Sequence, residues 1–350
     1  MTHEQARASF PVLEHCAYLN AGSVGPLSLA AHRAMAEWEE RALARGRAGA
    51  TYFEAAGELR VRLRDRLAAV VSVPADRVVL TASTTEGCNI VVTGLRLGPD
   101  DEVVITDAEH PGLEAPVRAS GAAVRVASVL GRPDGEVVAA VAAQVTARTR
   151  LVGLSHVLWL NGQVLPVAEI RRATGVPLLV DGAQSVGAVP VEAAAADFYT
   201  VSGQKWLCGP ELTGALYVAD PERLRPQMAA YAAMHQEGVD RLTVSHHSAS
   251  AVAGLLASLE QRPEWGFAAA AEMTAHCRDT LLEAGFAVHT PPGRGTIVAF
   301  SAPGDPDAAV ARCAELDVVI RRLPNGWLRA SCGWWNSAED VARLVSALRL

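Results

Sequence analysis

The sequence almost lacks lysine. Of its 31 basic residues, 30 are arginines and one, Lys205, is a lysine. Arginine can replace lysine at most surface positions, but a guanidinium cannot lose its proton and attack a carbonyl carbon as an amine can. The single lysine is therefore a candidate for amine chemistry. The alternative is that a codon-biased genome has kept one lysine by chance.

Other missing features exclude several classes of protein. The net charge is −7 and no basic cluster is present, which argues against nucleic acid and anionic membranes as partners. No long apolar run and no signal-like N-terminus occur, so a cytoplasmic protein without a membrane span is expected. Neither GxGxxG nor GxxxxGK[ST] is present, which argues against a nucleotide-binding protein.

The cysteines form no recognisable pattern. They are Cys16, Cys88, Cys208, Cys277, Cys313 and Cys332. Without a CxxC pair or a Cys/His cluster, the sequence predicts neither a zinc site nor a disulfide framework. No metal is expected, and the thiols are interpreted as reduced and mostly buried.

What is present indicates a globular α/β protein of two domains. Half of the 350 residues are hydrophobic, and the chain is longer than the ~250–300 residues at which single cores stop growing. Runs that are apolar throughout alternate with helical stretches, which predicts a three-layer fold with a mostly parallel sheet between helices. The predicted strands are 77–81, 102–106, 123–129, 150–157, 177–180, 197–201 and 214–218, with helices such as 135–145 and 167–174 between them.

The pattern of predicted helices and strands changes after residue 231. Helices are predicted at 248–259, 267–284 and 338–348, and strands at 296–300, 318–322 and 327–330. These elements indicate a smaller C-terminal α/β domain, and the arginine-rich stretch 30–69 predicts two helices. The predicted division is an N-terminal segment 1–20, a large domain 21–235 and a small domain 236–350.

Two residues that follow neighbouring strands suggest a cofactor. Asp181 ends the run 177–180, and Lys205 follows the run 197–201. Ligands of such sheets bind at the carboxyl ends of the strands, so both residues are expected in one crevice. Pyridoxal phosphate (PLP) needs this pair: a lysine forms the Schiff base, and an acid keeps the pyridine nitrogen protonated. An aspartate that only caps a turn is the alternative.

Further polar residues at strand ends fit the same cofactor. Ser83, Thr84 and Thr85 precede a predicted helix, whose N-terminal amides suit a phosphate dianion, although a plain helix cap has the same pattern. His110 follows the run 102–106 and could lie flat against an aromatic ring, while a surface histidine is the alternative. His156 also follows a strand.

Near the C-terminus, Arg329 lies on a predicted strand. An arginine fork binds a carboxylate through two hydrogen bonds, which would suit an amino-acid substrate. Most arginines are surface residues, so this assignment depends on its context.

Taken together, these motifs resemble PLP enzymes of fold type I, in the class V aminotransferase and cysteine desulfurase-like superfamily. The resemblance covers YLNAGS at 18–23, TASTTEG, DAEHPG, SHVLWLNGQVLP, LVDGAQSVGAVP, SGQKWLCGPELTGALYV and LRAS. Within the superfamily, DAEHPG and SHVLWLNGQVLP are most similar to cysteine/cystine C–S lyases. The resemblance implies a small amino-acid substrate and a homodimer.

The resemblance also implies a role for each matching residue. Lys205 would form the Schiff base, Asp181 would contact the pyridine nitrogen, Gln184 the phenolic oxygen, His110 would stack on the ring, and His156 would border it. Thr84, Thr85 and Ser202 would hold the phosphate, Arg329 would bind the substrate carboxylate, and Asn20 and Ala21 would line the entrance.

Two positions depart from the family pattern. Gln204 stands where relatives commonly carry a histidine, so this phosphate contact would come from a neutral amide. The stretch 219–245 is short, and His246 or His247 stands where relatives carry a threonine contributed across a dimer interface.

The resemblance leaves the reaction open. β-Elimination from a sulfur-containing amino acid, giving pyruvate, ammonia and a thiol or persulfide, is the first expectation. A cysteine desulfurase needs a cysteine on a loop that reaches the substrate sulfur, and the segment 317–327 has none. Cys332 is better interpreted as a buried residue, so a desulfurase is less expected than a lyase. An aminotransferase, an epimerase, a decarboxylating enzyme and a non-catalytic PLP-binding relative remain alternatives.

Overall fold

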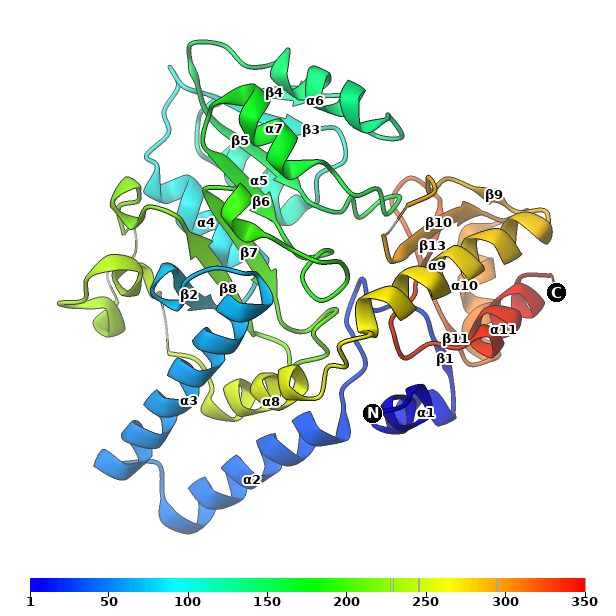
Figure 1. Cartoon of the computed structure of the whole chain (residues 1–350), viewed down its shortest axis with the longest axis horizontal. Coiled ribbons are helices and arrows are strands. Elements are labelled where there is room, and N and C mark those ends of the chain that lie inside the picture. Colours follow the sequence, from blue (N-terminus) through cyan, green and yellow to red (C-terminus); the bar gives the residue numbers. More distant parts are fainter. Residues whose placement is uncertain (227, 229, 245, 294, 350) are drawn as a thin grey trace.

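The computed structural model describes residues 1–226, 228, 230–244, 246–293 and 295–349. Its centre is a seven-stranded sheet in the order β2-β8-β7-β6-β5-β3-β4 (Figure 1). β8 alone runs opposite to the other six strands, so the prediction of a mostly parallel sheet is confirmed. The strands are β2 Val78–Thr81, β3 Glu102–Thr106, β4 Ala123–Ala127, β5 Thr149–Ser155, β6 Leu178–Asp181, β7 Phe198–Ser202 and β8 Gly214–Val218.

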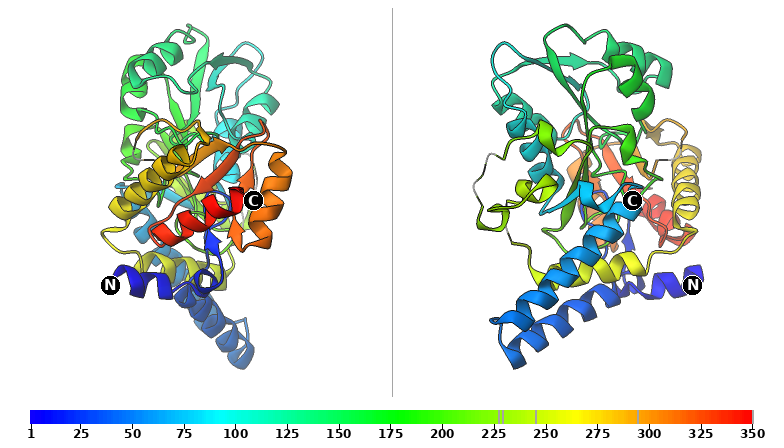
Figure 2. Two further views of the ribbon diagram at one scale, coloured as in Figure 1. Left: turned by 90° about the vertical axis from the view of Figure 1, so that its right-hand side faces the viewer. Right: turned by 60° about the vertical axis from the view of Figure 1, so that its left-hand side comes forward.

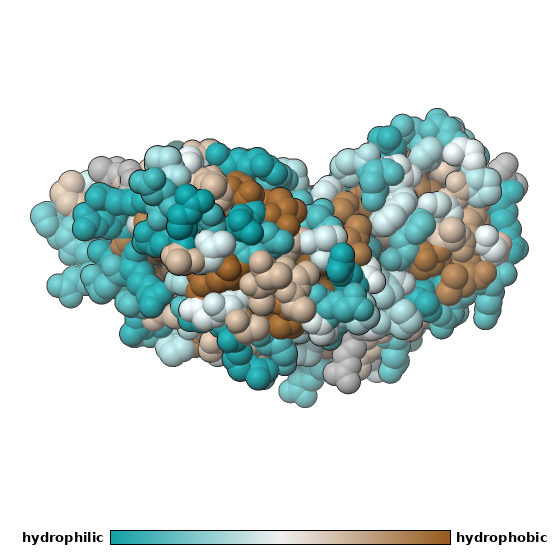
Figure 3. Space-filling model, turned by 90° about the horizontal axis from the view of Figure 1, so that it is seen from above, coloured by the Kyte–Doolittle hydropathy of each residue, from teal (hydrophilic) through white to brown (hydrophobic). Residues whose placement is uncertain are grey.

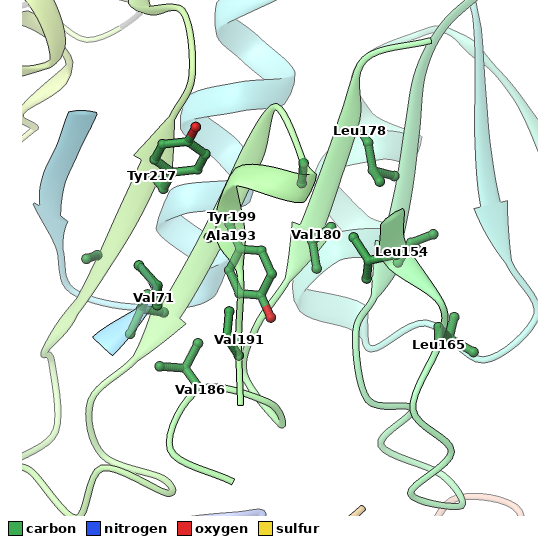
Figure 4. Packing of buried hydrophobic residues seen from close by; sticks show 14 of the residues in the cluster. Val71, Leu154, Leu165, Leu178, Val180, Val186, Val191, Ala193, Tyr199 and Tyr217 are labelled. Carbon is green, nitrogen blue, oxygen red and sulfur yellow. The ribbon is translucent and has the colours of Figure 1, made fainter. Parts of the chain in front are cut away.

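Helices cover both faces of this sheet, because its strands carry apolar side chains on both sides. Leu154, Val180 and Tyr199 on adjacent strands belong to one hydrophobic core (Figure 4). Leu179 and Phe198, which directly precede Val180 and Tyr199 in the chain, belong to the core on the other face. The first core is completed by α3 Ala50–Val70, α6 Asp134–Ala142, α7 Val167–Thr174 and α8 Ala249–Glu260, and the second by α4 Thr84–Gly94 and α5 Pro111–Ala119.

The second lobe contains a four-stranded antiparallel sheet in the order β12-β13-β10-β9. Its strands are β9 Ala287–Val288, β10 Ile297–Ser301, β12 Arg321–Arg322 and β13 Leu328–Ser331, and its helices are α9 Gly266–Glu283, α10 Pro306–Glu315 and α11 Ala338–Arg349. Seen from above, the two lobes are separated by a notch in the molecular surface (Figure 3). This confirms the predicted smaller α/β unit.

One predicted strand is split in two. The run 318–322 forms β11 Val318–Val319, which pairs with β1 Ala17–Tyr18, and then β12, which pairs with β13. The change of partner occurs at Ile320, whose side chain is buried. The sequence alone could not show this, because the partner of β11 lies about 300 residues away.

Two segments pack with a core that their position in the chain does not suggest. Ala17 and Leu19 belong to the core of the C-terminal lobe. Helix α8, which follows residue 235, places Val252 and Leu255 in the core of the large sheet and packs on α2 Leu29–Arg45 and α3. The division at residues 20 and 235 stays a prediction.

Helices α2 and α3 extend beyond the body of the molecule (Figures 1 and 2). Trp38 and Tyr52 pack against each other across the pair, with ring centroids 5.6 Å apart. Among the described residues, no helix has both the length and the apolar character needed to cross a lipid bilayer.

A buried ion pair fastens the N-terminal helix α1 His3–Ala8 to α11. The Arg7 guanidinium donates to both oxygens of Asp340 at 2.7 and 2.9 Å, and the Asp340 side chain is 1% exposed. We expect Arg7→Ala to lower the free energy of unfolding by ~3 kcal/mol, because it leaves a buried carboxylate without its cation. Urea denaturation would measure this loss.

The matched control is Arg62→Ala. Arg62 pairs with Glu260 at 3.2 Å, but both side chains are at least half exposed. Such a pair contributes ~0–1 kcal/mol. Equal losses in the two variants would contradict the role assigned to the Arg7 contact.

Candidate active site

The predicted catalytic pair lies at the ends of two adjacent parallel strands. Asp181 ends β6, is 3% exposed, and accepts a hydrogen bond from the Ala183 amide at 2.8 Å. Lys205 follows β7, and burial lowers the pKa of its amine to about 8, an effect that Asp181 opposes. A buried carboxylate and an amine with a lowered pKa, close enough for their charges to interact, are the chemical groups that PLP requires.

His110 is held in a defined orientation. It is the N-cap of α5, and its Nδ1 accepts a hydrogen bond from the Gly112 amide at 3.0 Å. Burial, followed by the charge of Lys205, lowers the pKa of the imidazole. A neutral, fixed imidazole is suited to packing against an aromatic cofactor.

The predicted phosphate loop forms the N-terminus of α4. The Ser83 hydroxyl accepts from the Glu86 amide at 3.1 Å, and Glu86 in turn accepts from the Ala82 amide at 2.7 Å. Ser83 is therefore used as a helix cap. Thr84 is buried and Thr85 is exposed at the same helix end. The first-turn amides there face a position that suits a dianion.

Glycine lets a second loop approach this helix end. A side chain at Gly112 would place its Cβ 2.6 Å from Oγ1 of Thr85. The loop that carries His110 thus lies directly against the predicted phosphate loop. From the other side, the buried Ser202 hydroxyl donates to Oε1 of Gln204 at 2.9 Å. The neutral amide that replaces the family histidine is thereby tied to another predicted phosphate contact.

His156 lies in a buried chain of hydrogen bonds. Its Nδ1 is 2.6 Å from the Tyr199 hydroxyl oxygen, which is itself 2.6 Å from Oγ of Ser185. Burial lowers the pKa of His156 to about 4, so the imidazole is neutral near pH 7. Nδ1 is occupied by Tyr199, which leaves Nε2 for other contacts.

The Gln184 carboxamide connects two parts of the site. Its Nε2 donates to the Gly22 carbonyl at 2.8 Å, and its Oε1 accepts from the Trp206 indole at 2.9 Å. Trp206 directly follows Lys205. A contact between Gln184 and a phenolic oxygen stays a prediction, and it would use the second amide proton.

Arg329 reaches the site from the second lobe. It lies on β13 with 0% exposure, and it donates to the Trp159 carbonyl at 3.3 Å and to Oγ of Ser23 at 3.1 Å. Its Nε has no hydrogen-bond partner, and within the described part of the chain no carboxylate pairs with it. Burial lowers its pKa to about 9. A buried guanidinium without an anion is costly, so this group is ready to receive a carboxylate.

A second arginine lies beside it. Arg321 on β12 pairs in register with Arg329 and donates to the same Ser23 oxygen at 3.2 Å. Ser23 in turn donates to Oδ1 of Asn20 at 2.8 Å, and Ala21 is fully buried. The predicted entrance segment thus holds the two guanidinium groups side by side.

Sequence reasoning gave no role to Arg321, Ser23 and Glu109, and it interpreted Trp159 as a core residue rather than a pocket residue. Trp159 packs its ring edge-to-face on His110 at 5.1 Å, and among the described residues its buried indole nitrogen has no hydrogen-bond partner. Glu109 is 7% exposed. None of these residues stands in a pattern that singles it out, although the YLNAGS, SHVLW and DAEH motifs contain three of them.

The position that relatives use across a dimer interface lies near the phosphate loop of its own chain. Nε2 of His247 is 3.1 Å from the Leu80 carbonyl oxygen, on the strand that leads to Ser83. Whether His246 or His247 serves a partner subunit stays a prediction. Ser245 lies outside the described residues.

All six cysteines are free and buried. Burial raises the pKa of the Cys208 thiol, which lies closest in sequence to Lys205. A neutral, buried thiol is a poor nucleophile. Over the described ranges, no group of three or more His, Cys, Asp or Glu side chains is arranged to hold a metal ion.

Comparison with known proteins identifies the family. The chain belongs to the aminotransferase class-V family, which matches residues 28–284. It is 35% identical over 228 residues to a probable cysteine desulfurase of Methanothermobacter thermautotrophicus, covering 62% of this chain and 56% of that protein. It is 29% identical over 328 residues to isopenicillin N epimerase of Streptomyces clavuligerus, covering 81% and 82%.

Solved structures agree with this assignment. A variant of C-DES with glycine covalently linked to its PLP cofactor has a TM-score of 0.91 and 29% identity over 98% of each chain. The cystine C–S lyase C-DES with its product cysteine persulfide has a TM-score of 0.90 and 29% identity, over 97% of this chain and 98% of that one. The family is PLP-dependent, and PLP is its cofactor. This chain is a class V PLP enzyme with C–S lyase relatives.

Proposed function

We propose that this enzyme cleaves the C–S bond of a disulfide amino acid by β-elimination, releasing pyruvate, ammonia and a persulfide. The observation that carries this proposal is the pair of guanidinium groups at Arg321 and Arg329, which share Ser23 and have no carboxylate partner among the described residues. Two adjacent cations favour a substrate with two carboxylates. Cystine has one at each end.

Each side chain has a distinct task in this proposal. Arg329 binds the α-carboxylate and so orients the Cα–H bond, while Arg321 receives the distal carboxylate. The Lys205 amine takes the α-proton, because burial has lowered its pKa to about 8. Asp181 would pair with the pyridine nitrogen of PLP, which would supply the electron sink when bound. His110 and Trp159, whose rings pack edge-to-face, line the site.

The cysteines favour elimination over desulfuration. A desulfurase transfers sulfur to a thiolate of its own, and such a thiolate has to reach the substrate. All six thiols here are buried, and none lies between residues 317 and 327. The C–S lyase relative of known structure supports the same choice.

The test is pyruvate formation with a pair of substrates. L-Cystine should give a kcat/KM at least ~10-fold higher than S-methyl-L-cysteine, because only cystine fills both guanidinium sites. Lys205→Ala serves as the control and should release no pyruvate. Equal rates for the two substrates would contradict the role proposed for Arg321.

An epimerase is the second candidate. It is supported by the similarity to isopenicillin N epimerase over most of both chains. Solvent deuterium exchange at Cα, followed by NMR without pyruvate release, would favour epimerisation over elimination. The homodimer and the cytoplasmic location stay predictions.

A further inference from the structure

The turn between β3 and α5 carries two carboxyl groups, Asp107 and Glu109, which form hydrogen bonds with different segments of the chain. Asp107 accepts from the Ser128 hydroxyl at 2.8 Å and from the Val129 amide at 2.9 Å, in the segment that follows β4. Asp107 is exposed, whereas Glu109 is 7% exposed. The same short turn therefore offers one solvated acid and one buried acid, directly before His110.

Glu109 joins the ends of two strands. Its Oε1 accepts from the Thr106 hydroxyl at 2.5 Å, at the end of β3, and its Oε2 accepts from the Ser155 hydroxyl at 2.7 Å, at the end of β5. Ser155 is the register partner of Asp181 on β6. Glu109 thus adjoins three predicted cofactor contacts: His110 follows it in the chain, and Asp181 and His156 are neighbours of Ser155.

This arrangement is costly for the fold. Within the described structure, the Glu109 carboxyl accepts from two neutral hydroxyls and from the Ser155 backbone, and no arginine or lysine pairs with it. Burial raises its pKa to about 7, and the charge of Asp181 acts in the same direction. Apolar side chains would fill such a place at lower cost. A buried acid retained without a cation suggests a use in the site.

We propose that Glu109 is a positioning residue of the PLP site, which ties the strand ends below His110 and adds a second acidic group beside Asp181. The proposal rests on the PLP-dependent function. The titratable groups that face it are Asp181 on β6, Cys88 on α4 and the neighbouring His110. Lys205 interacts in turn with Asp181.

This role has a consequence for pH dependence. Above pH 7 the Glu109 carboxyl is ionised, and its negative charge would favour the protonated, cationic form of the Lys205 nitrogen when PLP is attached to it. Glu109→Gln keeps the shape of the side chain and removes the charge. The pH midpoint of the visible absorption of bound PLP should therefore fall by about 0.5 units or more. Glu109→Ala should also weaken PLP binding by ~10-fold or more, because both hydroxyls lose their acceptor.

The experiment uses the purified holoenzyme, with Asp107→Asn as the matched control. Both isosteric variants alter the same turn, but only Glu109→Gln removes a charge next to Asp181. We expect the pH midpoint to shift in Glu109→Gln and to stay within about 0.1 units in Asp107→Asn. Equal shifts in both variants, or none in Glu109→Gln, would overturn the proposal.

A second variant protects the test against a failure to fold. Ser155→Ala removes one of the two hydroxyl donors to Glu109, so the Glu109 carboxylate is less stabilised and its pKa rises further. The visible midpoint should then shift in the same direction as in Glu109→Gln, and an unchanged midpoint would contradict the proposal. These readouts need bound PLP but no turnover. Wild-type protein that binds PLP and forms no pyruvate would refute the proposed elimination and leave this test intact.

Discussion

Lys205→Ala is expected to lower kcat by at least ~10³-fold and to abolish covalent attachment of PLP. The chain has no other lysine that could replace it. Burial lowers the pKa of this amine to about 8, so a substantial fraction of it is uncharged near neutral pH. Asp181 and the α4 N-terminus stay in place in the variant, so PLP should still bind, without its covalent link. Absorbance spectra and pyruvate release measure the two effects.

The scarcity of lysine makes the attachment site easy to verify. Borohydride reduction of the wild-type holoenzyme followed by peptide mass spectrometry should find PLP on the peptide that contains Lys205. Lys205→Arg is the matched control, because it keeps a positive charge but supplies no nucleophilic amine. Turnover by Lys205→Arg above about 1% of the wild-type rate would contradict the assignment. So would a PLP adduct at any other position.

The pKa of Lys205 sets the expected acid limb of the pH dependence of kcat. Burial lowers the pKa of Lys205 from 10.5 to about 8, so the neutral amine that accepts a proton is available from about pH 8 upward. We expect kcat to rise with pH and to level off near that value. If kcat instead rose until about pH 10, the amine would be as solvated as that of a free lysine, which would contradict this prediction.

Buried parallel strands were predictable because of their chemistry. A strand covered on both faces is apolar throughout and stops at a polar residue or glycine, so the predicted run 102–106 coincides with β3 and the helix 167–174 with α7. The short strands of the second lobe depend on distant partners. The segment 318–322 is an example, since its first two residues pair with β1 instead of continuing into β12.

The residues of the candidate site also differ in whether the sequence could predict them. Asp181, Lys205 and His110 were predictable because each follows a strand of one parallel sheet, and such strand ends meet at one edge. Arg321 and Ser23 were not, because their pairing joins segments about 300 residues apart. Among 30 arginines, the sequence offers no mark that separates Arg321 from its exposed neighbour Arg322. Only the fold places one of them beside Arg329.

Arg329→Gln is expected to lower kcat/KM by ~100-fold or more, chiefly through a rise in KM. The guanidinium is fully buried, donates to Trp159 and Ser23, and has a free Nε. A carboxylate bound there would be shielded from water, so its loss costs more than a surface contact. Arg329→Lys should recover only a small part of the loss, because an ammonium cannot offer two parallel donors. Steady-state kinetics with L-cystine measure both variants.

Arg322→Gln is the matched control for this experiment. Arg322 lies next to Arg321 on the same strand but is exposed, and it is 3.6 Å from the exposed Asp307. Its replacement should change kcat/KM by less than about 2-fold, because a solvated pair contributes little. If Arg329→Gln had an equally small effect, the substrate carboxylate would have to bind elsewhere. Arg329→Gln should also raise the KM for S-methyl-L-cysteine, since the α-carboxylate is common to both substrates. Replacement of Arg321, in contrast, should raise the KM for cystine alone.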